Sequence, residues 1–498
     1  MAAFILVAGA YTGGWVWGEV AGRLREAGGS VYPAELTGMG GDGPPAGAGT
    51  DLERHIRDVV ELIDRADEAE IVLVGHDYGI HPVLGAADRR PQRIARVVYV
   101  DAGMAQDGAS ALALVPDPTV HEALAGGASA IPAPTSREGW QRWGSTEGVG
   151  DAALERLTRL AVPQPRSTLT QPLQLTGAAA ALPITGVLCV ANGASIAGVE
   201  ALVRLGDPRL QALVDPEVTF FELATGHWPM LSAPDELADV LIAAAKGDGH
   251  RVSPPTEGEL PPHLQPFLLD VPEQRRERTG RVDLHLPEAD GPRPAVVFVH
   301  GGPVPAGVEP TPRDWPTFVG YAQYAASLGA VGATVDHRLH DISAYPQAAE
   351  DVAAAVELVR ADPRVDPDRV ALWFVSAGGL LSAEWIAERP PWLRCVAASY
   401  PILVPLPNWG LTDPRFHPVA ALGAADRPPI VLIRVERERP EIAVTVAEFL
   451  AAAEETTADV EVIDLPGGEH GFEAVDRSEA ALRAVERAMS SVLGHLVT

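Results

Sequence analysis

One local pattern occurs twice in this chain, and it constrains the fold more than any other feature. A short apolar run at 71–74 leads into the turn Gly75-His76-Asp77-Tyr78-Gly79. A second apolar run at 370–374 leads into Val375-Ser376-Ala377-Gly378-Gly379. Fully apolar runs of this length are typical of strands buried on both faces of a parallel sheet. The sequence therefore predicts two strand–turn–helix units with a reactive side chain at each apex, Asp77 in one and Ser376 in the other.

The rest of the chain alternates strand-like and helix-like segments on both sides of its midpoint. Helical spacing of apolar residues is clearest at 17–26, 51–65 and 348–360. Strand-like runs occur at 4–8, 71–74, 96–100, 187–191, 218–223, 281–286, 294–300, 330–336, 370–374, 394–399, 430–435 and 460–465. This alternation predicts an α/β fold in which helices cover both faces of a mostly parallel, doubly wound sheet. At 498 residues, we expect two such domains in tandem.

The domain boundaries follow from breaks in the pattern. A polar, proline-rich stretch at 247–262 predicts a linker between a domain at 1–246 and a second at 263–498. In the first domain, strand-like runs disappear between about 104 and 182. His227 follows Asp77 by 150 residues, whereas His470 follows Ser376 by only 94. We therefore expect a helical cap in the first domain and a minimal one in the second.

Composition narrows the classes of partner. The net charge of −29 argues against binding to nucleic acid or to anionic membranes. No run is long enough to cross a membrane, and the N-terminal apolar run leads into a glycine turn, so a cytoplasmic protein is expected. The two cysteines, Cys189 and Cys395, are predicted to be buried free thiols. The sequence indicates a small-molecule substrate, no cofactor and no metal, and it leaves a homo-oligomer open.

The second turn resembles the nucleophile elbow of α/β-hydrolases. His470 follows the last expected strand and Glu438 follows the one before it, in the chain order Ser…Glu…His that this fold uses. With Asp336-His337-Arg338, these residues resemble the carboxylesterase and dienelactone-hydrolase-like branch. The resemblance implies Ser376 as nucleophile, His470 as base and Glu438 as acid, with Glu436 as a competing acid. It also implies an oxyanion hole built from Gly301, Gly302 and Ala377. Phe374 departs from the pattern, because a small residue is usual there, and it is expected to crowd the turn.

The first half has a different resemblance. The segment Ala224-Thr225-Gly226-His227-Trp228-Pro229-Met230 and the opening Val7-Ala8-Gly9-Ala10-Tyr11 resemble hydroxynitrile-lyase and methylesterase-like hydrolases. The elbow itself looks like that of haloalkane dehalogenases and epoxide hydrolases. The resemblance implies a triad of Asp77, His227 and Asp101. The implied oxyanion and pocket residues are Ala10, Tyr11, Tyr78, Trp140 and Trp143.

The two apex residues imply different chemistry. Attack of an aspartate on an ester would give an anhydride, but its attack on an sp³ carbon gives an alkyl ester that water can hydrolyse. The main expectation is a hydrolase of small-molecule esters or lactones that uses the Ser376 site. The alternative is a biosynthetic lyase or cyclase, or an epoxide- or halide-type hydrolase, in the first domain with the second as scaffold. A third reading is a small-molecule binder without catalysis.

Overall fold

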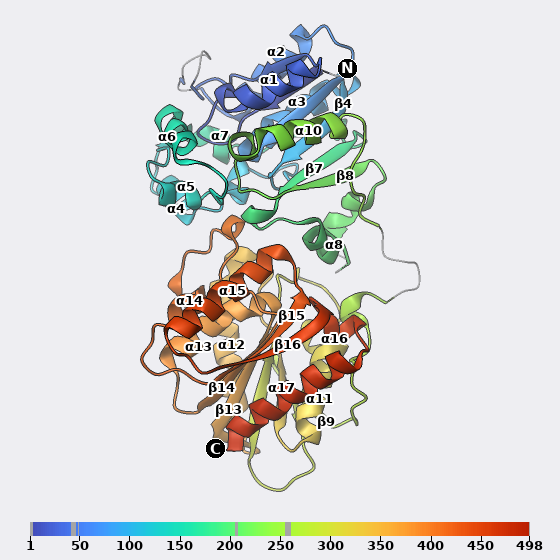
Figure 1. The fold of residues 1–498 in the computed structure, drawn as a ribbon, viewed down its shortest axis with the longest axis vertical. Coiled ribbons are helices and arrows are strands. Elements are labelled where there is room, and N and C mark those ends of the chain that lie inside the picture. Colours follow the sequence, from blue (N-terminus) through green and yellow to red (C-terminus); the bar gives the residue numbers. More distant parts are fainter. Residues whose placement is uncertain (1–2, 41–45, 48, 205–207, 254–259, 498) are drawn as a thin grey trace. The chain divides into compact units, whose positions relative to one another are not determined.

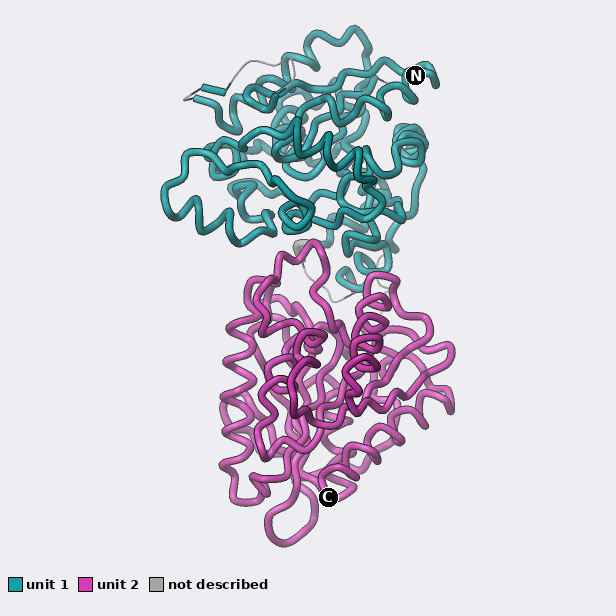
Figure 2. The backbone as a smooth tube through the Cα atoms, turned by 60° about the vertical axis from the view of Figure 1, so that its left-hand side comes forward, with its two compact units in different colours: residues 1–203, 208–254 teal, residues 204–207, 255–498 magenta. Residues whose placement is uncertain are grey.

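The computed structural model describes residues 3–40, 46–47, 49–204, 208–253 and 260–497 (Figure 1). The chain divides into two compact units (Figure 2). The first contains residues 1–203 and 208–254, and the second contains residues 204–207 and 255–498. Part of the expected linker, residues 254–259, lies outside the described residues.

The first unit is built on a six-stranded sheet in the order β2-β1-β3-β4-β7-β8, and all its neighbouring strands are parallel. Its strands are β1 (Ala3–Val7), β2 (Val31–Pro33), β3 (Ile71–His76), β4 (Ile94–Val100), β7 (Ile184–Cys189) and β8 (Val218–Leu223). Every residue of β1 and β3 is buried. This explains their uninterrupted apolar sequences, because a central strand of a parallel sheet is covered on both faces.

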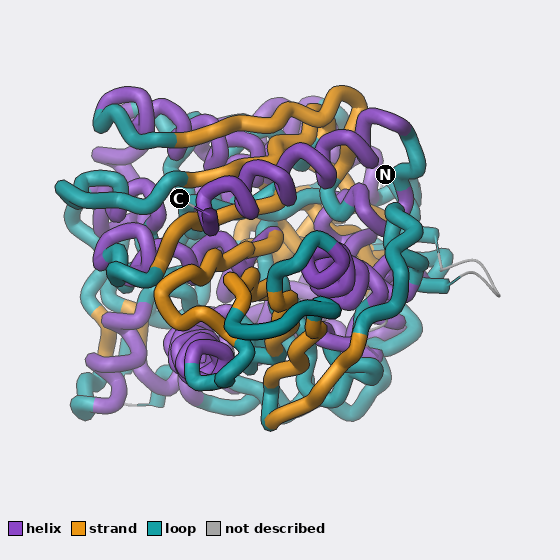
Figure 3. The backbone as a smooth tube through the Cα atoms, turned by 90° about the horizontal axis from the view of Figure 1, so that it is seen from below, coloured by secondary structure: helices purple, strands orange, loops and turns teal. Residues whose placement is uncertain are grey.

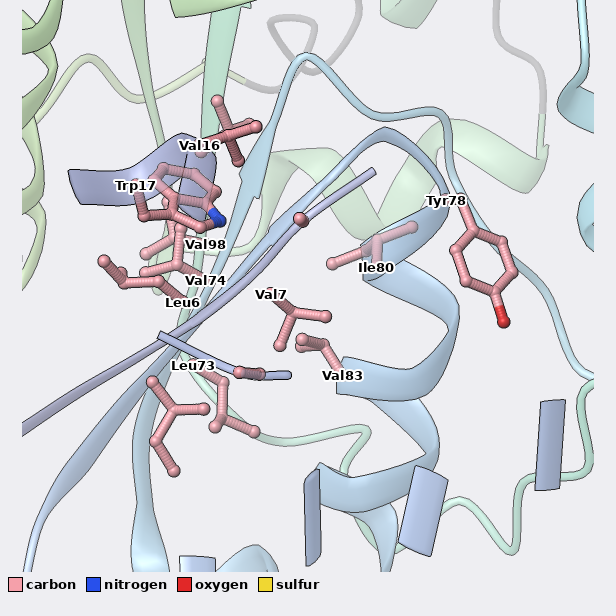
Figure 4. Packing of buried hydrophobic residues seen from close by; sticks show 14 of the residues in the cluster. Leu6, Val7, Val16, Trp17, Leu73, Val74, Tyr78, Ile80, Val83 and Val98 are labelled. Carbon is pink, nitrogen blue, oxygen red and sulfur yellow. The ribbon is translucent and has the colours of Figure 1, made fainter. Parts of the chain in front are cut away.

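Helices cover both faces of this sheet. On one face, α1 (Gly18–Glu26) packs against α10 (Pro234–Ala244), and on the other α2 (Leu52–Arg65) packs against α3 (Ile80–Arg89). Asp51 caps α2 by accepting the Arg54 backbone N–H at 2.8 Å. Figure 4 shows the core between these layers, with side chains from both faces of the strands: Leu6, Val7, Val16, Trp17, Leu73, Val74, Ile80, Val83 and Val98.

A helical insertion separates β4 from β7, in the segment where the cap is expected. Its helices are α4 (Pro118–Ala125), α5 (Arg137–Gln141), α6 (Asp151–Leu160) and α7 (Arg166–Thr170), which gather at one end of the unit (Figure 1). The short strands β5 (Ala130–Ile131) and β6 (Gln164–Pro165) pair antiparallel within it. Beyond β7, the first unit also contains α8 (Ile196–Arg204), up to residue 203, and α9 (Pro229–Ser232).

The second unit has an eight-stranded sheet in the order β16-β15-β14-β13-β11-β12-β10-β9. Its pairings are parallel except at one edge, where β10 runs antiparallel to both β12 and β9. The strands are β9 (Arg275–Thr279), β10 (Val282–Leu286), β11 (Arg293–Val299), β12 (Val331–Val335), β13 (Val365–Val375), β14 (Leu393–Ser399), β15 (Ile430–Arg437) and β16 (Val460–Glu469).

Alternate residues of the central strands face two separate helical layers. Val297 and Val299 of β11 belong to one apolar cluster, and Val296 and Phe298 belong to another, as the two-residue period of a strand requires. Figure 3 shows the strands running between helical segments. The first layer contains α12 (Tyr345–Arg360), α13 (Ala383–Glu388), α14 (Pro418–Ala421) and α15 (Pro440–Glu455); the second contains α11 (Pro316–Ser327) and α17 (Glu479–Val497), and α16 (Phe472–Val475) follows β16.

A glycine substitution tests how tightly the first elbow is packed. A Cβ on Gly79 would lie 2.6 Å from the Ala8 carbonyl oxygen and 2.7 Å from that of Val7. We expect Gly79→Ala to destabilise the first unit by about 1–3 kcal/mol, because rigid backbone must shift. Calorimetric unfolding midpoints of the full chain measure the effect.

Gly22→Ala is the matched control. Nothing lies within 4 Å of a Cβ at Gly22, inside α1, so alanine there should stabilise the helix by about 0.5–1 kcal/mol. Equal midpoints for the Gly79→Ala variant and the unsubstituted protein would show that the elbow is not packed as described.

Candidate active sites

Both apex residues lie on left-handed turns at the carboxyl edge of a sheet. Asp77 follows β3 with φ of 47°, and Ser376 follows β13 with φ of 53°. This region is sparsely populated by residues with a side chain, so both turns are strained. Because the strands are parallel, the loops that follow neighbouring strands meet at the same edge. The candidate histidines and their acids lie on those loops, after β4, β8, β15 and β16.

In the second unit, three predicted residues form a continuous hydrogen-bonded chain. Ser376 Oγ lies 2.7 Å from His470 Nε2. On the other side of the ring, His470 Nδ1 lies 2.8 Å and 3.0 Å from the two oxygens of Glu438. The Nδ1–H therefore donates to the carboxylate, which leaves the Nε2 lone pair to accept the serine proton. This is the arrangement of a nucleophile, a base and an orienting acid.

The competing acid, Glu436, is directed elsewhere. Its Oε2 accepts the backbone N–H of Gly467 at 2.7 Å, and its side chain is exposed.

Phe374 does not disrupt the elbow, contrary to the expectation from the sequence. Its ring is fully buried among the helices of the first layer, and the turn after it continues as a 3₁₀ helix, Ser376–Ser382.

Burial decides the protonation of His470. Removal of the imidazolium from water outweighs the attraction of Glu438, so the pKa of His470 lies below its ordinary value. The ring is therefore neutral at neutral pH, the form that a general base needs. Its side chain is 19% exposed, which leaves it open to substrate and water.

The loop after β11 lies directly against the serine. A Cβ on Gly301 would lie 2.8 Å from Ser376 Cβ and 3.4 Å from Oγ, so only glycine permits this approach. Gly302 follows in the same loop, and Ala377 follows Ser376 on the buried side of the elbow. The structure thus places Gly301 against the nucleophile, with Ala377 next to it in the chain, whereas a Cβ on Gly302 would meet Leu339 and Val304 instead.

In the first unit, Asp101 and His227 form a buried pair. His227 Nδ1 lies 2.7 Å from Asp101 Oδ2, and both side chains are at most 6% exposed. Asn192 donates through Nδ2 to the same Asp101 oxygen at 2.7 Å. Asn192 stands after β7, and its amide helps to orient the acid, which follows β4. No local pattern in the sequence marks Asn192, because its partner Asp101 is distant in the chain.

Asp77 is held by the loop after β1. Its Oδ2 accepts the Ala10 N–H at 3.0 Å. The expectation for Tyr11 was wrong in one respect, because its N–H donates instead to Gln164 Oε1 at 3.0 Å. Tyr78, the residue after the apex, is buried, and its hydroxyl contacts His55 Nδ1 at 2.8 Å. Ala10 is therefore the donor of the β1 loop that meets the carboxylate.

The pKa of the histidine in the first site is shifted in the opposite direction to that of the histidine in the second. Burial disfavours the His227 imidazolium, but the hydrogen bond and charge of Asp101, with the charge of Asp77, outweigh it and raise the pKa of His227. Burial and neighbouring His227 lower the pKa of His76 to about 4. His76 Nε2 contacts the His227 carbonyl oxygen at 2.7 Å, so the neutral ring supports the histidine loop.

The cap packs directly over this histidine. A Cβ on Gly144 would lie 2.6 Å from His227 Cβ, so the insertion touches the loop that carries the base. Trp140 and Trp143 pack edge-on against Tyr11, with ring centroids 6.0 Å and 4.8 Å away. Both indoles are buried, and Trp140 Nε1 donates to Thr158 Oγ1. In this structure the two tryptophans hold the cap to the body of the unit rather than face an open pocket.

The described part of the chain has no group of three or more His, Cys, Asp or Glu side chains placed to hold a metal ion. Within the same residues, no helix is long and apolar enough to cross a membrane.

The first site should become a serine esterase with one substitution. In a Ser376→Ala background, Asp77→Ser would place a hydroxyl at an elbow that already has His227, Asp101 and the Ala10 N–H. We expect p-nitrophenyl acetate hydrolysis to rise at least about tenfold above the Asp77→Ala control in the same background, because a nucleophile needs only its base and orienting acid. Equal rates for the serine and alanine variants would show that His227 does not reach the apex.

Comparison with known proteins gives a match to a family model in each half of the chain. Residues 4–240 match the model of the alpha/beta hydrolase family, and residues 282–385 match the BD-FAE model. The carbendazim hydrolyzing esterase of Nocardioides sp. (strain SG-4G) is 34% identical over 248 residues, which cover 49% of this chain and 99% of that protein. The alpha-hydroxynitrile lyase of Arabidopsis thaliana is 32% identical over 100 residues, 20% of this chain and 39% of the lyase.

Among solved structures, an extracellular alpha/beta-hydrolase from a Paenibacillus species aligns with 49% of this chain and 99% of its own, at 23% identity and a TM-score of 0.40. The match to the esterase spans nearly its whole length at more than 30% identity, and a family model matches in each half. This chain belongs to the alpha/beta hydrolase family.

Proposed function

We propose that the second unit hydrolyses small-molecule esters or lactones by serine catalysis. The observation that carries this proposal is the 2.7 Å contact between Ser376 Oγ and His470 Nε2, with Glu438 bound to the opposite ring nitrogen. A serine hydroxyl is a weak nucleophile until a base takes its proton, and this geometry supplies the base and its orienting acid together.

Each residue of the site has a distinct step. His470 accepts the Ser376 proton as Oγ attacks the carbonyl carbon, and Glu438 stabilises the imidazolium that forms. Backbone N–H groups of the Gly301-Gly302 loop and of Ala377 stabilise the oxyanion. The imidazolium then protonates the departing alcohol. In the second half-reaction, His470 activates a water molecule that hydrolyses the acyl-enzyme and restores Ser376.

The short connection between β14 and β15 favours small esters, because they need no large cap to enclose them. In the described residues between β14 and β15, the longest α-helix is α14, of four residues. The relative named for carbendazim hydrolysis makes carbendazim a specific compound to test beside p-nitrophenyl acetate.

Substitutions at two nearby glutamates, Glu436 and Glu438, distinguish loss of this mechanism from a general effect on the fold. We expect Ser376→Ala and Glu438→Gln each to lower kcat/KM for p-nitrophenyl acetate at least about 10³-fold, as loss of a triad member does. Glu436→Gln, which removes a charge two residues away but no triad contact, should change the rate less than about threefold. Steady-state kinetics of the full chain would contradict the proposal if the two glutamine variants behaved alike.

We propose, as a second candidate, that the first unit hydrolyses a substrate with an electrophilic sp³ carbon. The supporting observation is Asp77 fixed at a strained apex beside a buried His227–Asp101 pair. Asp77 would displace an epoxide oxygen or a halide and form an alkyl ester, and water activated by His227 would hydrolyse it. Because the pKa of His227 is raised, this second step should gain rate as the pH rises.

The covalent intermediate makes this candidate testable. In His227→Gln, the alkyl ester on Asp77 should accumulate, since it forms but cannot be hydrolysed. Mass spectrometry of the intact protein, after incubation with a panel of small epoxides and alkyl halides, should then show an added mass on the peptide that contains Asp77. Asp77→Asn in the same background is the control that should show none. An unmodified His227→Gln protein would favour the lyase or binding alternatives.

A further inference from the structure

A second carboxyl group is buried behind the histidine of the serine site. Glu473 lies three residues after His470, in α16, and it is 1% exposed. Its Oε1 accepts the hydroxyl of Tyr321, from α11, at 2.7 Å. Its other oxygen, Oε2, is buried without a hydrogen-bond partner among the described residues. A buried carboxyl group with one unsatisfied oxygen is costly and has no role in the triad described above.

Tyr400 connects this carboxyl group to the catalytic imidazole. Its ring packs edge-on against His470, with ring centroids 4.6 Å apart. It also packs edge-on against Phe472, with ring centroids 5.8 Å apart. Phe472 directly precedes Glu473, so Tyr400 packs on the same helical turn that carries the carboxyl group. Burial and the charge of the nearby Glu473 raise the pKa of Tyr400. Tyr400 also has φ of 37°, so the chain adopts a strained conformation to place this ring.

The groups around Glu473 leave its charge largely uncompensated. Tyr321 from α11 and Tyr400 after β14 face it directly. Arg477, which follows α16, donates to the backbone oxygen of Glu473 rather than to its carboxyl group. The turn Pro262–Leu264 also packs on α16 and contributes His263, whose ring lies against Trp315. Burial consequently raises the pKa of Glu473 to about 7, so the group changes charge near neutral pH.

We propose that Glu473 is a positioning residue for the serine site: once ionised, it stabilises the His470 imidazolium of the transition state through Tyr400, which it holds against the ring. This inference rests on the proposed serine mechanism. The ionised carboxylate adds negative charge behind the imidazole, within the protein interior, where such interactions are stronger than in water. Tyr400 remains protonated, because burial, reinforced by Glu473, raises its pKa, and it can donate its hydroxyl to the carboxylate. Glu438 orients the His470 ring directly, whereas the charge of Glu473 changes with pH and with it the stabilisation of the His470 imidazolium.

The test compares pH profiles of the full chain with Glu473→Gln, which resembles the protonated form at every pH. The ratio of kcat in the unsubstituted protein to kcat in Glu473→Gln should rise roughly threefold to tenfold between about pH 6 and about pH 8, on either side of the Glu473 value of about 7. This corresponds to a charge interaction of about half to one pKa unit at His470. A structural role alone would give a ratio that does not change with pH.

Tyr321→Phe provides a second variant with an intact carboxyl group. The Tyr321 hydroxyl favours the ionised form of Glu473, so its loss should move the pH step to a higher value without abolishing it. Circular dichroism and thermal unfolding identify a variant that fails to fold, and either variant alone decides the inference. A constant kcat ratio for Glu473→Gln, or an unmoved step in Tyr321→Phe, would overturn it.

Histidine titration by NMR separates this inference from the proposed function. With ¹³C- or ¹⁵N-labelled histidine, the His470 signal should show a second inflection near the Glu473 value, and Glu473→Gln should remove that inflection. This measurement needs no turnover. If the inflection is present but hydrolysis does not depend on Ser376, the proposed esterase function is refuted and the coupling between Glu473 and His470 stands. If hydrolysis depends on Ser376 but the inflection is absent, the esterase function stands and the coupling is refuted.

Discussion

Both candidate sites depend on a left-handed turn immediately after a buried central strand. Asp77 and Ser376 adopt φ of 47° and 53°, a conformation that costs about 1–3 kcal/mol for a residue with a side chain. Small residues make the turn possible: the Cβ positions of Gly79 and Gly378 would each lie 2.6 Å from a carbonyl oxygen of the neighbouring strand end. Favourable packing of the sheet offsets the cost of the strained turn. The turn in turn exposes the reactive side chain at the edge of the sheet.

Two sites with the same backbone plan differ in their charge. His470 has one carboxylate partner and sufficient burial to keep its pKa low, so it is ready to accept a proton. His227 lies between Asp101 and Asp77, and its pKa is raised, so it tends to hold a proton. The identity of the apex residue contributes to this difference, because an aspartate is a charge as well as a nucleophile. One backbone plan thus places two differently charged sites in a single chain.

The features visible in the sequence were those that depend on local pattern. Central strands were recognisable because burial on both faces requires an unbroken apolar run, as in β3 and in residues 370–375 of β13. The edge strand β9 was missed because its sequence is almost entirely charged; Arg276 and Arg278 instead bind the buried Asp283 of β10. Asn192 and Glu473 were missed for another reason, since their contacts are with residues distant in the chain or on other elements, and no local pattern marks them.

The sequence by itself determined the α/β class, the two elbows and the order of Ser376, Glu438 and His470, because periodicity and turn chemistry are local properties. Tertiary structure decided which side chains meet. Glu436 lies within β15 and binds the Gly467 N–H, whereas Glu438 lies beyond the end of the strand and reaches His470. It likewise decided that Ala10, and not Tyr11, donates to Asp77. Nearby residues that offer the same chemical group differ only in the direction in which that group points, and the packing of the whole sheet sets this direction.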